Sequence, residues 1–407
     1  MREADYDIIF VGAGLSGGLA AYRLRQLQPQ LRILLVDEPR AATYEQTWSF
    51  QGLAEPPKGP WGQALYRPQS SWLAPLLTRS WESYDVRFPR RQRHLNLSYH
   101  SLRYQDFKAH LRATFGADFL EGRVLRFHAR AVSLADGRSW QANCVIDARG
   151  WPAEELEDVG YQKFVGLNLE LKEAHGLDRP ILKDACVPQT DGYRFFYVLP
   201  WTSHSLLIED THYSLNPSLD VNDYEHEIRS YAKARGWQIK TEISREQGVL
   251  PIPLWGLEAP RPSLDWPRIG AGAGLFHAVT GYSIYEAVCT AEWLASQTSF
   301  QVGPLTVACT IRAQDVWRQQ GFLRRLNNML FYAALPDRRY TVLERFYSHP
   351  EALIARFYMG TLRVRDKLRI LTGKPPVPVH KGLYYFFHKF GVTHGTAQKL
   401  AAVKDSP

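Results

Sequence analysis

Six residues near the start of the chain, Gly12-Ala13-Gly14-Leu15-Ser16-Gly17, decide the fold. They follow an apolar run typical of a buried strand, and they open a helical pattern over Leu15–Leu27. Gly12 permits a tight turn, Gly14 lets the backbone approach a pyrophosphate, and Gly17 allows the helix to pack closely. The N-terminus of the helix attracts the anion. The stretch therefore predicts a nucleotide-binding site in a strand-helix-strand unit.

An acidic pair strengthens this prediction. Asp37 and Glu38 stand 20 and 21 residues after Gly17, at the end of a second predicted strand over residues 31–36. An acidic side chain at this position accepts hydrogen bonds from a cofactor ribose. Asp37 is the better placed of the two, and we expect it to bind the ribose.

Two later segments complete the predicted nucleotide-binding domain. One apolar run ends in Asp147-Ala148-Arg149-Gly150, and another leads into the glycine-rich stretch 270–274. NAD and FAD share the first fingerprint, but these segments resemble the later segments of glutathione-reductase-type and aromatic-hydroxylase-type flavoproteins. That resemblance implies FAD, with Asp147, Gly150 and Gly270 as cofactor-binding candidates. Those flavoproteins usually have Gly-Asp at the last position, whereas this chain has Gly270-Ala271, so we expect a different anchor for the ribityl chain.

Gly281-Tyr282-Ser283 precedes a predicted helix over residues 284–294. In flavoproteins with a helix in this place, the isoalloxazine ring meets the helix N-terminus, whose partial positive charge favours an anionic reduced flavin. Gly281 and Tyr282 are therefore further cofactor-binding candidates. An ordinary capped helix is the alternative interpretation.

The organisation of the chain is predicted from the remaining patterns. Strand-like runs over residues 180–187, 193–199 and 205–211 indicate an antiparallel sheet inserted into the nucleotide-binding domain. After residue 305 the pattern is helical, and in one helix apolar residues such as Leu323 and Leu330 alternate with a polar face of Arg324, Arg325, Asn327 and Asn328. We expect a mixed α/β fold with a Rossmann-type FAD-binding domain (1–84, 120–155 and 262–300), a substrate-binding β-sheet region (85–119 and 156–261) and a helical, basic C-terminal region (301–407).

Charge and composition indicate which kinds of partner the protein binds. The net charge is +8, but the segment from Arg312 to the end carries 17 Lys and Arg against 6 Asp and Glu. A basic, amphipathic helical region favours an anionic membrane surface over nucleic acid, although a solvated basic face has the same pattern. Aromatic residues make up 13% of the chain, which suits either a long apolar ligand or a ring-rich core.

Cysteine usage and the chain start indicate a location. The four cysteines form no Cys-x-x-Cys pair, the first residues are too acidic for a signal peptide, and no segment is long and apolar enough to span a bilayer. We therefore expect a cytoplasmic protein, peripheral at the inner face of the cell membrane.

Several further motifs are spread along the chain. They are Thr47-Trp48-Ser49-Phe50, Val86-Arg87-Phe88-Pro89, Gly192-Tyr193-Arg194-Phe195, residues 206–213 (Leu-Leu-Ile-Glu-Asp-Thr-His-Tyr), Glu246-Gln247-Gly248, 273–277, Thr280-Gly281-Tyr282-Ser283 and 373–378. In these motifs, over nearly its whole length, the sequence resembles the bacterial lycopene β-cyclases. The family implies an enzyme that binds FAD, needs it reduced by NAD(P)H, and converts lycopene, or related acyclic carotenoids, through γ-carotene to β-carotene. The chain departs from the family at Ala278-Val279, where Pro-Thr is common, and at Gly272, where Arg is frequent.

Glu209 corresponds to the essential acid of that family. Protonating an unactivated alkene requires an acid that stays protonated near neutral pH, and burial raises the pKa of a carboxyl group. Glu209 follows three apolar residues, 206–208, on a predicted strand. Alternation places Leu207, Glu209 and Thr211 on one face and Asp210 on the other, so we assign Asp210 a structural role.

Other residues are expected around the substrate. Glu209, once deprotonated, is the simplest candidate for the final base, and His277 is a second, although a His beside Phe276 is more often a packed residue. Trp48, Tyr193 and Phe195, with Tyr282, either line the substrate pocket or belong to the core.

Two rival functions remain open from the sequence. A redox flavoenzyme, such as a carotenoid hydroxylase or desaturase, would use the same cofactor domain. A flavoprotein that carries carotenoid without converting it would share the same pocket. The sequence contains no P-loop, Gly-x-Ser-x-Gly elbow or metal motif that favours other chemistry.

Overall fold

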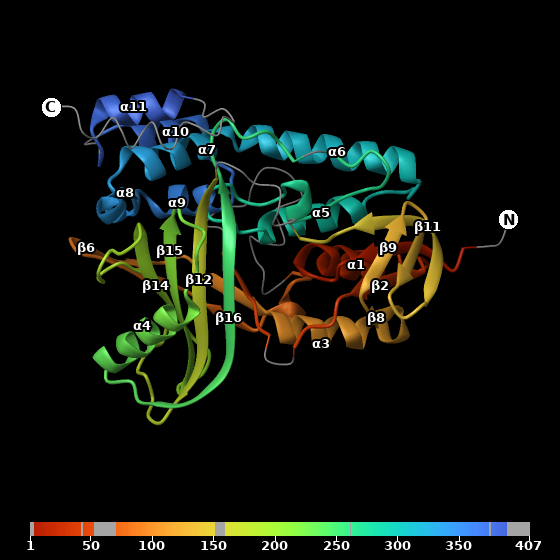
Figure 1. The fold of residues 1–407 in the computed structure, drawn as a ribbon, viewed down its shortest axis with the longest axis horizontal. Helices are drawn as coiled ribbons and strands as arrows, with labels where there is room; N and C mark the ends of the chain where they lie inside the picture. The colour runs from red at the N-terminus through yellow and green to blue at the C-terminus, as the bar shows by residue number, and fades with distance from the viewer. Residues whose placement is uncertain are drawn as a thin grey trace.

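The computed structural model describes residues 4–41, 44–52, 71–150, 159–260, 262–373 and 376–388. Two large sheets lie at opposite ends of the molecule, and a layer of C-terminal helices runs across them (Figure 1). The chain crosses between the two halves several times, because segments far apart in sequence contribute to each sheet.

The first sheet carries the glycine-rich turn. Its strand order is β8-β2-β1-β11-β10-β9, with the first four strands parallel and the last two antiparallel. The strands β1 and β2 are almost uninterrupted apolar runs, as expected for parallel strands covered on both faces. The bounds are β1 (Tyr6–Val11), β2 (Ile33–Asp37), β8 (Phe119–Glu121), β9 (Val124–His128), β10 (Ala131–Leu134) and β11 (Ser139–Asp147).

One face of this sheet is covered by α1 (Leu15–Leu27), α3 (Tyr104–Phe115) and α5 (Ile284–Ala295), and Leu305 and Cys309 of α6 (Val302–Gln319) join the same core. The observed bounds of α1 match the predicted helix. At Gly18 an added Cβ would lie 2.7 Å from the Phe107 ring of α3, so the two helices are in close contact. The expectation that 85–119 belongs wholly to the substrate sheet is therefore wrong for α3, whose buried face, including Phe107 and Leu111, packs in the nucleotide-binding core.

The second sheet has the order β16-β12-β15-β14-β13-β5-β6 and is antiparallel except between β13 and β5. Its longest strands, β12 and β16, were not predicted from the sequence. One face packs on α4 (Val221–Ala234), and the other on the C-terminal helices. The bounds are β5 (Tyr84–Phe88), β6 (Arg91–Leu95), β12 (Val159–Leu171), β13 (Ile181–Asp184), β14 (Tyr193–Pro200), β15 (Ser205–Ser214) and β16 (Ile239–Pro253).

A small sheet connects the two halves. It consists of β3 (Thr47–Gln51), β7 (Tyr99–Arg103) and β4 (Arg79–Trp81), with β7 in the centre.

The α-helices of the C-terminal layer are α6 (Val302–Gln319), α7 (Gly321–Asn328), α8 (Tyr340–Phe346), α9 (Glu351–Tyr358), α10 (Val364–Leu371) and α11 (Val379–Phe387). The short turns are η3 (Ala74–Leu76), η4 (Gly116–Asp118), η5 (Ala271–Ala273), the π-helix η6 (Met329–Ala333) and η7 (Pro336–Arg338). In the described part of the chain, no helix is long and apolar enough to cross a bilayer.

The polar face of α7 is mostly buried, contrary to its amphipathic pattern. The Asn327 amide donates to the carbonyl oxygens of Pro253 and Ala278, at 2.8 and 2.9 Å. Arg324 donates to the Trp317 carbonyl at 2.6 Å. Asn327 thereby joins the end of β16 to the 278 loop, and Arg324 bonds to the end of α6, although within the described structure Arg324 Nε and Asn327 Oδ1 have no hydrogen-bond partner.

Candidate active site

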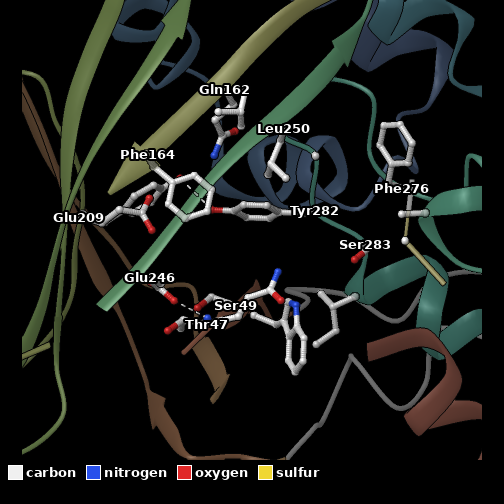
Figure 2. Close-up of a pocket in the computed structure, with 18 of the residues that line it drawn as sticks. Thr47, Ser49, Gln162, Phe164, Glu209, Glu246, Leu250, Phe276, Tyr282 and Ser283 are labelled. Atoms are coloured by element: carbon white, nitrogen blue, oxygen red, sulfur yellow. Dashed lines mark hydrogen bonds between the residues drawn. The ribbon is translucent and has the colours of Figure 1, made fainter. Parts of the chain in front are cut away.

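A cavity of about 680 Å³ lies where the seven-stranded sheet meets the small sheet and the N-terminus of α5. Its walls are mainly apolar, but two carboxyl groups point into it (Figure 2). Such a pocket, apolar with a few convergent polar groups, is typical of a small-molecule site. It is lined by Gln46, Thr47, Trp48, Ser49, Tyr99, Gly150, Tyr161, Gln162, Phe164, Tyr197, Leu199, Leu207, Glu209, Pro217, Glu246, Val249, Leu250, Pro251, Ala271, Phe276, Gly281, Tyr282, Ser283 and Ile284.

The sheet places four residues of the site in one row. Gly166 of β12 pairs with Glu209 of β15 on one side and with Glu246 of β16 on the other. Glu209 in turn pairs with Tyr197 of β14. Directly paired residues share a face of the sheet, so both carboxyl groups and the phenol face the cavity.

Glu209 has the environment of a proton donor. Its remaining exposure is to the cavity, and the Thr211 hydroxyl donates to its Oε1 at 2.6 Å. Burial raises the pKa of Glu209 well above its ordinary value, and the neighbouring Glu246 raises it further. The hydrogen bond from Thr211 and the nearby Lys183 act in the opposite direction but are weaker. Burial and the neighbouring carboxyl group therefore both favour the protonated form of Glu209.

Glu246 is a site residue that we did not single out from the sequence. It is 4% exposed, and its Oε2 accepts a hydrogen bond from the Thr47 backbone N–H at 2.6 Å. Burial raises its pKa to about 7, partly offset by the Thr47 hydrogen bonds. The only signal in the sequence was its place in the Glu-Gln-Gly motif.

A buried lysine stands at the far end of the row. Lys183 lies at an irregularity in the pairing of β13, has a positive φ of 66°, and is 4% exposed. Its Nζ donates to the Tyr197 hydroxyl at 3.0 Å, and that hydroxyl shares a 2.8 Å hydrogen bond with the Tyr282 hydroxyl. Burial lowers the pKa of Lys183 to about 7. A lysine directly after the apolar residues Ile181 and Leu182 was the signal that the sequence offered.

The glycine-rich turn has the geometry that phosphate binding requires. Gly12 has a φ of 100°, and a Cβ at Gly17 would lie 2.0 Å from the Gly12 carbonyl oxygen. A Cβ at Gly14, by contrast, would meet nothing within 4 Å. The turn is therefore tight where α1 packs and open at the N-terminus of α1, where a phosphate group fits.

The two predicted acidic ligands differ in their surroundings. Asp37 lies beside the turn, where it accepts from the Ala13 N–H at 3.0 Å and forms an ion pair with Lys108 of α3. Asp147, at the end of β11, is 3% exposed, accepts a hydrogen bond from Arg149 at 2.9 Å and forms an ion pair with Arg268 at 3.4 Å. Its carboxylate ties two chain segments together, so the structure supports an internal role for Asp147 in place of the expected cofactor contact.

The other cofactor candidates lie around the same space. Gly150, Gly281 and Tyr282 line the cavity. Gly270 has a φ of 75°, and a Cβ there would lie 2.9 Å from the Ser16 side chain at the start of α1. The N-terminus of α5 opens on the cavity through Ser283. The structure thus brings the separated segments together as a flavin would require.

The predicted pocket aromatics divide into two groups. Trp48 lines the cavity, but Tyr193 and Phe195, exposed by 1% or less, belong to the core between β14 and the C-terminal helices. They share a face of β14 with Tyr197 but lie farther along the strand. The expectation that Tyr193 and Phe195 contact the substrate is corrected to a packing role.

His277 is also a structural residue. Its Nε2 bonds the Phe357 carbonyl at 2.7 Å, and its Nδ1 bonds the Thr280 hydroxyl at 3.0 Å. Burial lowers its pKa to about 4, so the ring is neutral. Both ring nitrogens are engaged away from the cavity lining, which corrects the suggestion that His277 is a final base.

The expected role of Asp210 agrees with the structure. It lies on the opposite face of β15 and accepts from Arg194 at 2.6 and 3.0 Å. Among the residues that the structure describes, no cluster of His, Cys, Asp and Glu could hold a metal ion.

The fold defines a class of protein. The structure is similar to a geranylgeranyl bacteriochlorophyll reductase-like protein from Thermoplasma acidophilum, with a TM-score of 0.57 and 14% identity over 94% of this chain and 99% of that one. It is also similar to a flavin-dependent halogenase from Xanthomonas campestris, with a TM-score of 0.56 and 12% identity over 98% and 96% of the two chains. The chain therefore has the fold of flavin-dependent enzymes.

Sequence similarity identifies the family. The model of the lycopene cyclase protein family matches residues 7–383. The chain is 44% identical to a lycopene beta-cyclase of Pantoea ananas, over 93% of this chain and 97% of that one, and 42% identical to a lycopene beta-cyclase of Pseudescherichia vulneris, over 92% and 95%. The chain belongs to the lycopene cyclase family, as the sequence motifs predicted.

Proposed function

We propose that this enzyme is a lycopene β-cyclase that closes the acyclic end groups of lycopene to β-rings, through γ-carotene to β-carotene, without net redox change. The family membership supports the reaction, and Glu209 supports its mechanism. A carboxyl group held protonated by burial, at the wall of an apolar cavity, is the acid that alkene protonation requires.

The ring closure needs one proton in and one proton out. The Glu209 carboxyl transfers its proton to the terminal double bond, which leaves a tertiary cation. The next double bond along the end group attacks that cation and closes a six-membered ring. Loss of a proton from the ring carbon that formed the new bond then gives the neutral β-ring. Glu209, now a carboxylate at the same wall, takes that proton. The apolar lining, including Phe164, Leu207 and Leu250, excludes water that would otherwise trap the cation.

FAD is the cofactor that the residues fit. Gly12, Gly14 and Gly17 would hold the pyrophosphate at the N-terminus of α1, Asp37 the ribose, and the segment around Gly281 the ring system. When bound in its reduced, anionic form, after reduction by NAD(P)H, the flavin would supply negative charge near the cationic end group.

We also propose that α10 and α11 rest on an anionic membrane surface. Residues 363–388 contain six Lys and Arg but a single acid, Asp366, which is ion-paired to Arg356 at 2.7 Å. Both helices flank Phe322 of α7, through Lys367 and Phe386, so they are neighbours. Each helix exposes apolar side chains spaced three or four residues apart, which places them on one face of the helix. They are Val364, Leu368 and Leu371 on α10, and Val379, Leu383 and Phe387 on α11. Apolar residues beside basic ones favour interfacial binding.

Product analysis tests the reaction. Lycopene-accumulating cells expressing the protein should form monocyclic and bicyclic products of unchanged mass, and Glu209→Gln should reduce the rate about 10²–10⁴-fold. Glu242→Gln, on the same sheet but at the surface, is the control. Products heavier by oxygen or lighter by hydrogen would indicate a redox flavoenzyme, and unconverted lycopene bound to the purified protein would indicate a carrier.

Vesicle flotation tests the membrane contact. The protein should float with vesicles that contain anionic phospholipid and bind weakly to purely zwitterionic ones. Leu383→Glu, which places a charge in the exposed apolar stripe, should abolish flotation while product formation in detergent persists. Equal binding of this variant would refute the proposed face.

A further inference from the structure

The second carboxyl group of the cavity has no part in the mechanism above. Glu246 lies next to Glu209 across a single strand, because both pair with Gly166. A Cβ at Gly166 would lie 2.9 Å from the Glu246 Cγ and 3.0 Å from the Leu207 Cδ1. The missing side chain therefore leaves the space in which the Glu246 side chain lies beside Glu209. Figure 2 shows the two carboxyl groups directed into the same part of the cavity.

Neither carboxyl group has a cationic partner in contact. Among the described residues, no lysine or arginine forms an ion pair with Glu209 or Glu246 within 4.0 Å. The positive charge of Arg103 lowers the pKa of Glu246, but the Arg103 guanidinium is itself paired with Glu45 at 2.7 Å. Lys183 acts on Glu209 from the far end of the row. Two adjacent buried carboxyl groups without a counterion do not both ionise readily, so the pair retains at least one proton near neutral pH.

The hydrogen bonds decide which group holds that proton. Glu246 accepts from a backbone N–H, that of Thr47, which can only donate and therefore favours the carboxylate. Glu209 is bonded to the Thr211 hydroxyl, which can donate to a carboxylate or accept from a carboxylic acid. The arrangement thus places the negative charge on Glu246 and the proton on Glu209.

We propose that Glu246 is a positioning residue for the reaction, a fixed carboxylate beside Glu209 across Gly166 that keeps Glu209 protonated and ready to act as the acid. The inference rests on the proposed cyclase function. It also explains how the donor is reloaded: after ring closure, repulsion from Glu246 favours return of a proton to Glu209. The charged and titratable groups that face the pair include Lys183 on β13, Arg103 and Tyr99 on β7, Tyr197 on β14, Tyr213 on β15, and Tyr44 and Glu45 before β3.

The pH dependence of turnover tests this role. In the wild type, activity should fall as Glu209 deprotonates at high pH. In Glu246→Gln the neighbouring charge is gone, so this alkaline limb of kcat should move to lower pH by about one to three pH units. KM for lycopene should change little. Glu242→Gln, on the same strand, should keep the wild-type profile. A uniform loss of kcat with an unshifted limb would show a merely structural role and overturn the proposal.

A spectroscopic measurement separates this proposal from the cyclase function. Infrared spectra of the purified holoenzyme near neutral pH should contain the C=O band of one buried carboxylic acid that disappears in Glu209→Gln. In Glu246→Gln the Glu209 band should persist but titrate at lower pH than in the wild type. This readout needs no turnover, so it stands even if lycopene is not the substrate. A Glu209 band that is absent in the wild type, or that titrates unchanged in Glu246→Gln, would refute the proton-sharing pair.

Discussion

Replacing Glu246 by Gln should make the folded protein more stable at alkaline pH. The pKa of Glu246 is raised from its ordinary 4.5 to about 7 because the group is buried. Between these pH values the folded state binds more protons at Glu246 than the unfolded state does. The contribution of protonated Glu246 to the stability of the folded state is therefore fully present below pH 4.5 and is lost as the pH rises through 7. A tenfold change in an ionisation equilibrium corresponds to about 1.4 kcal/mol, so ionised Glu246 costs about 3 kcal/mol above neutrality.

Urea unfolding of wild type and Glu246→Gln at about pH 5 and about pH 8 measures this contribution. At about pH 5 wild-type Glu246 is still largely protonated, so its ionisation should make the free energies of unfolding of the two proteins differ by about 1 kcal/mol or less. At about pH 8 the free energy of unfolding of the variant should exceed that of the wild type by about 2 kcal/mol or more. The amide keeps the size of the side chain and can accept from the Thr47 N–H. Glu242→Gln, at the surface of the same strand, should show no such pH-dependent gain. An equal difference between Glu246→Gln and wild type at both pH values would refute the reasoning.

The remaining predictions concern packing and the cofactor turn. Arg194→Met should lower the free energy of unfolding by about 3–5 kcal/mol, measured by urea titration, because it removes the guanidinium partner of the buried Asp210 carboxylate and leaves that carboxylate the His212 ring, 3.2 Å away. Gly14→Ala should fold normally, by circular dichroism, but lose flavin absorbance, since the added Cβ meets only the space assigned to phosphate. Gly17→Ala should neither fold normally nor bind flavin, because the added Cβ would lie 2.0 Å from a backbone atom. Tyr193→Phe should be neutral or slightly stabilising in thermal unfolding and leave the carotenoid products unchanged, because within the described structure this buried hydroxyl has no hydrogen-bond partner. A changed product profile would return Tyr193 to the pocket.

The sequence by itself determined the local features of this protein. The glycine spacing and the apolar runs predicted β1, α1 and β2, because a phosphate-binding turn needs particular backbone conformations at particular residues. Strand alternation placed Glu209 and Asp210 on opposite faces of β15, as observed, because side chains alternate in any strand whatever its neighbours are.

Tertiary structure alone decided what surrounds these groups. Alternation gives the face of a residue but not the register between strands, so the meeting of Glu209 with Glu246 over Gly166 could not be read from either segment. A bulge in β13 brought Lys183 into the same row. Likewise His277 and Asn327 of α7 are buried where carbonyl oxygens from distant segments accept hydrogen bonds from them. Such burial depends on partners supplied by the rest of the fold, and no local pattern records which partners those are.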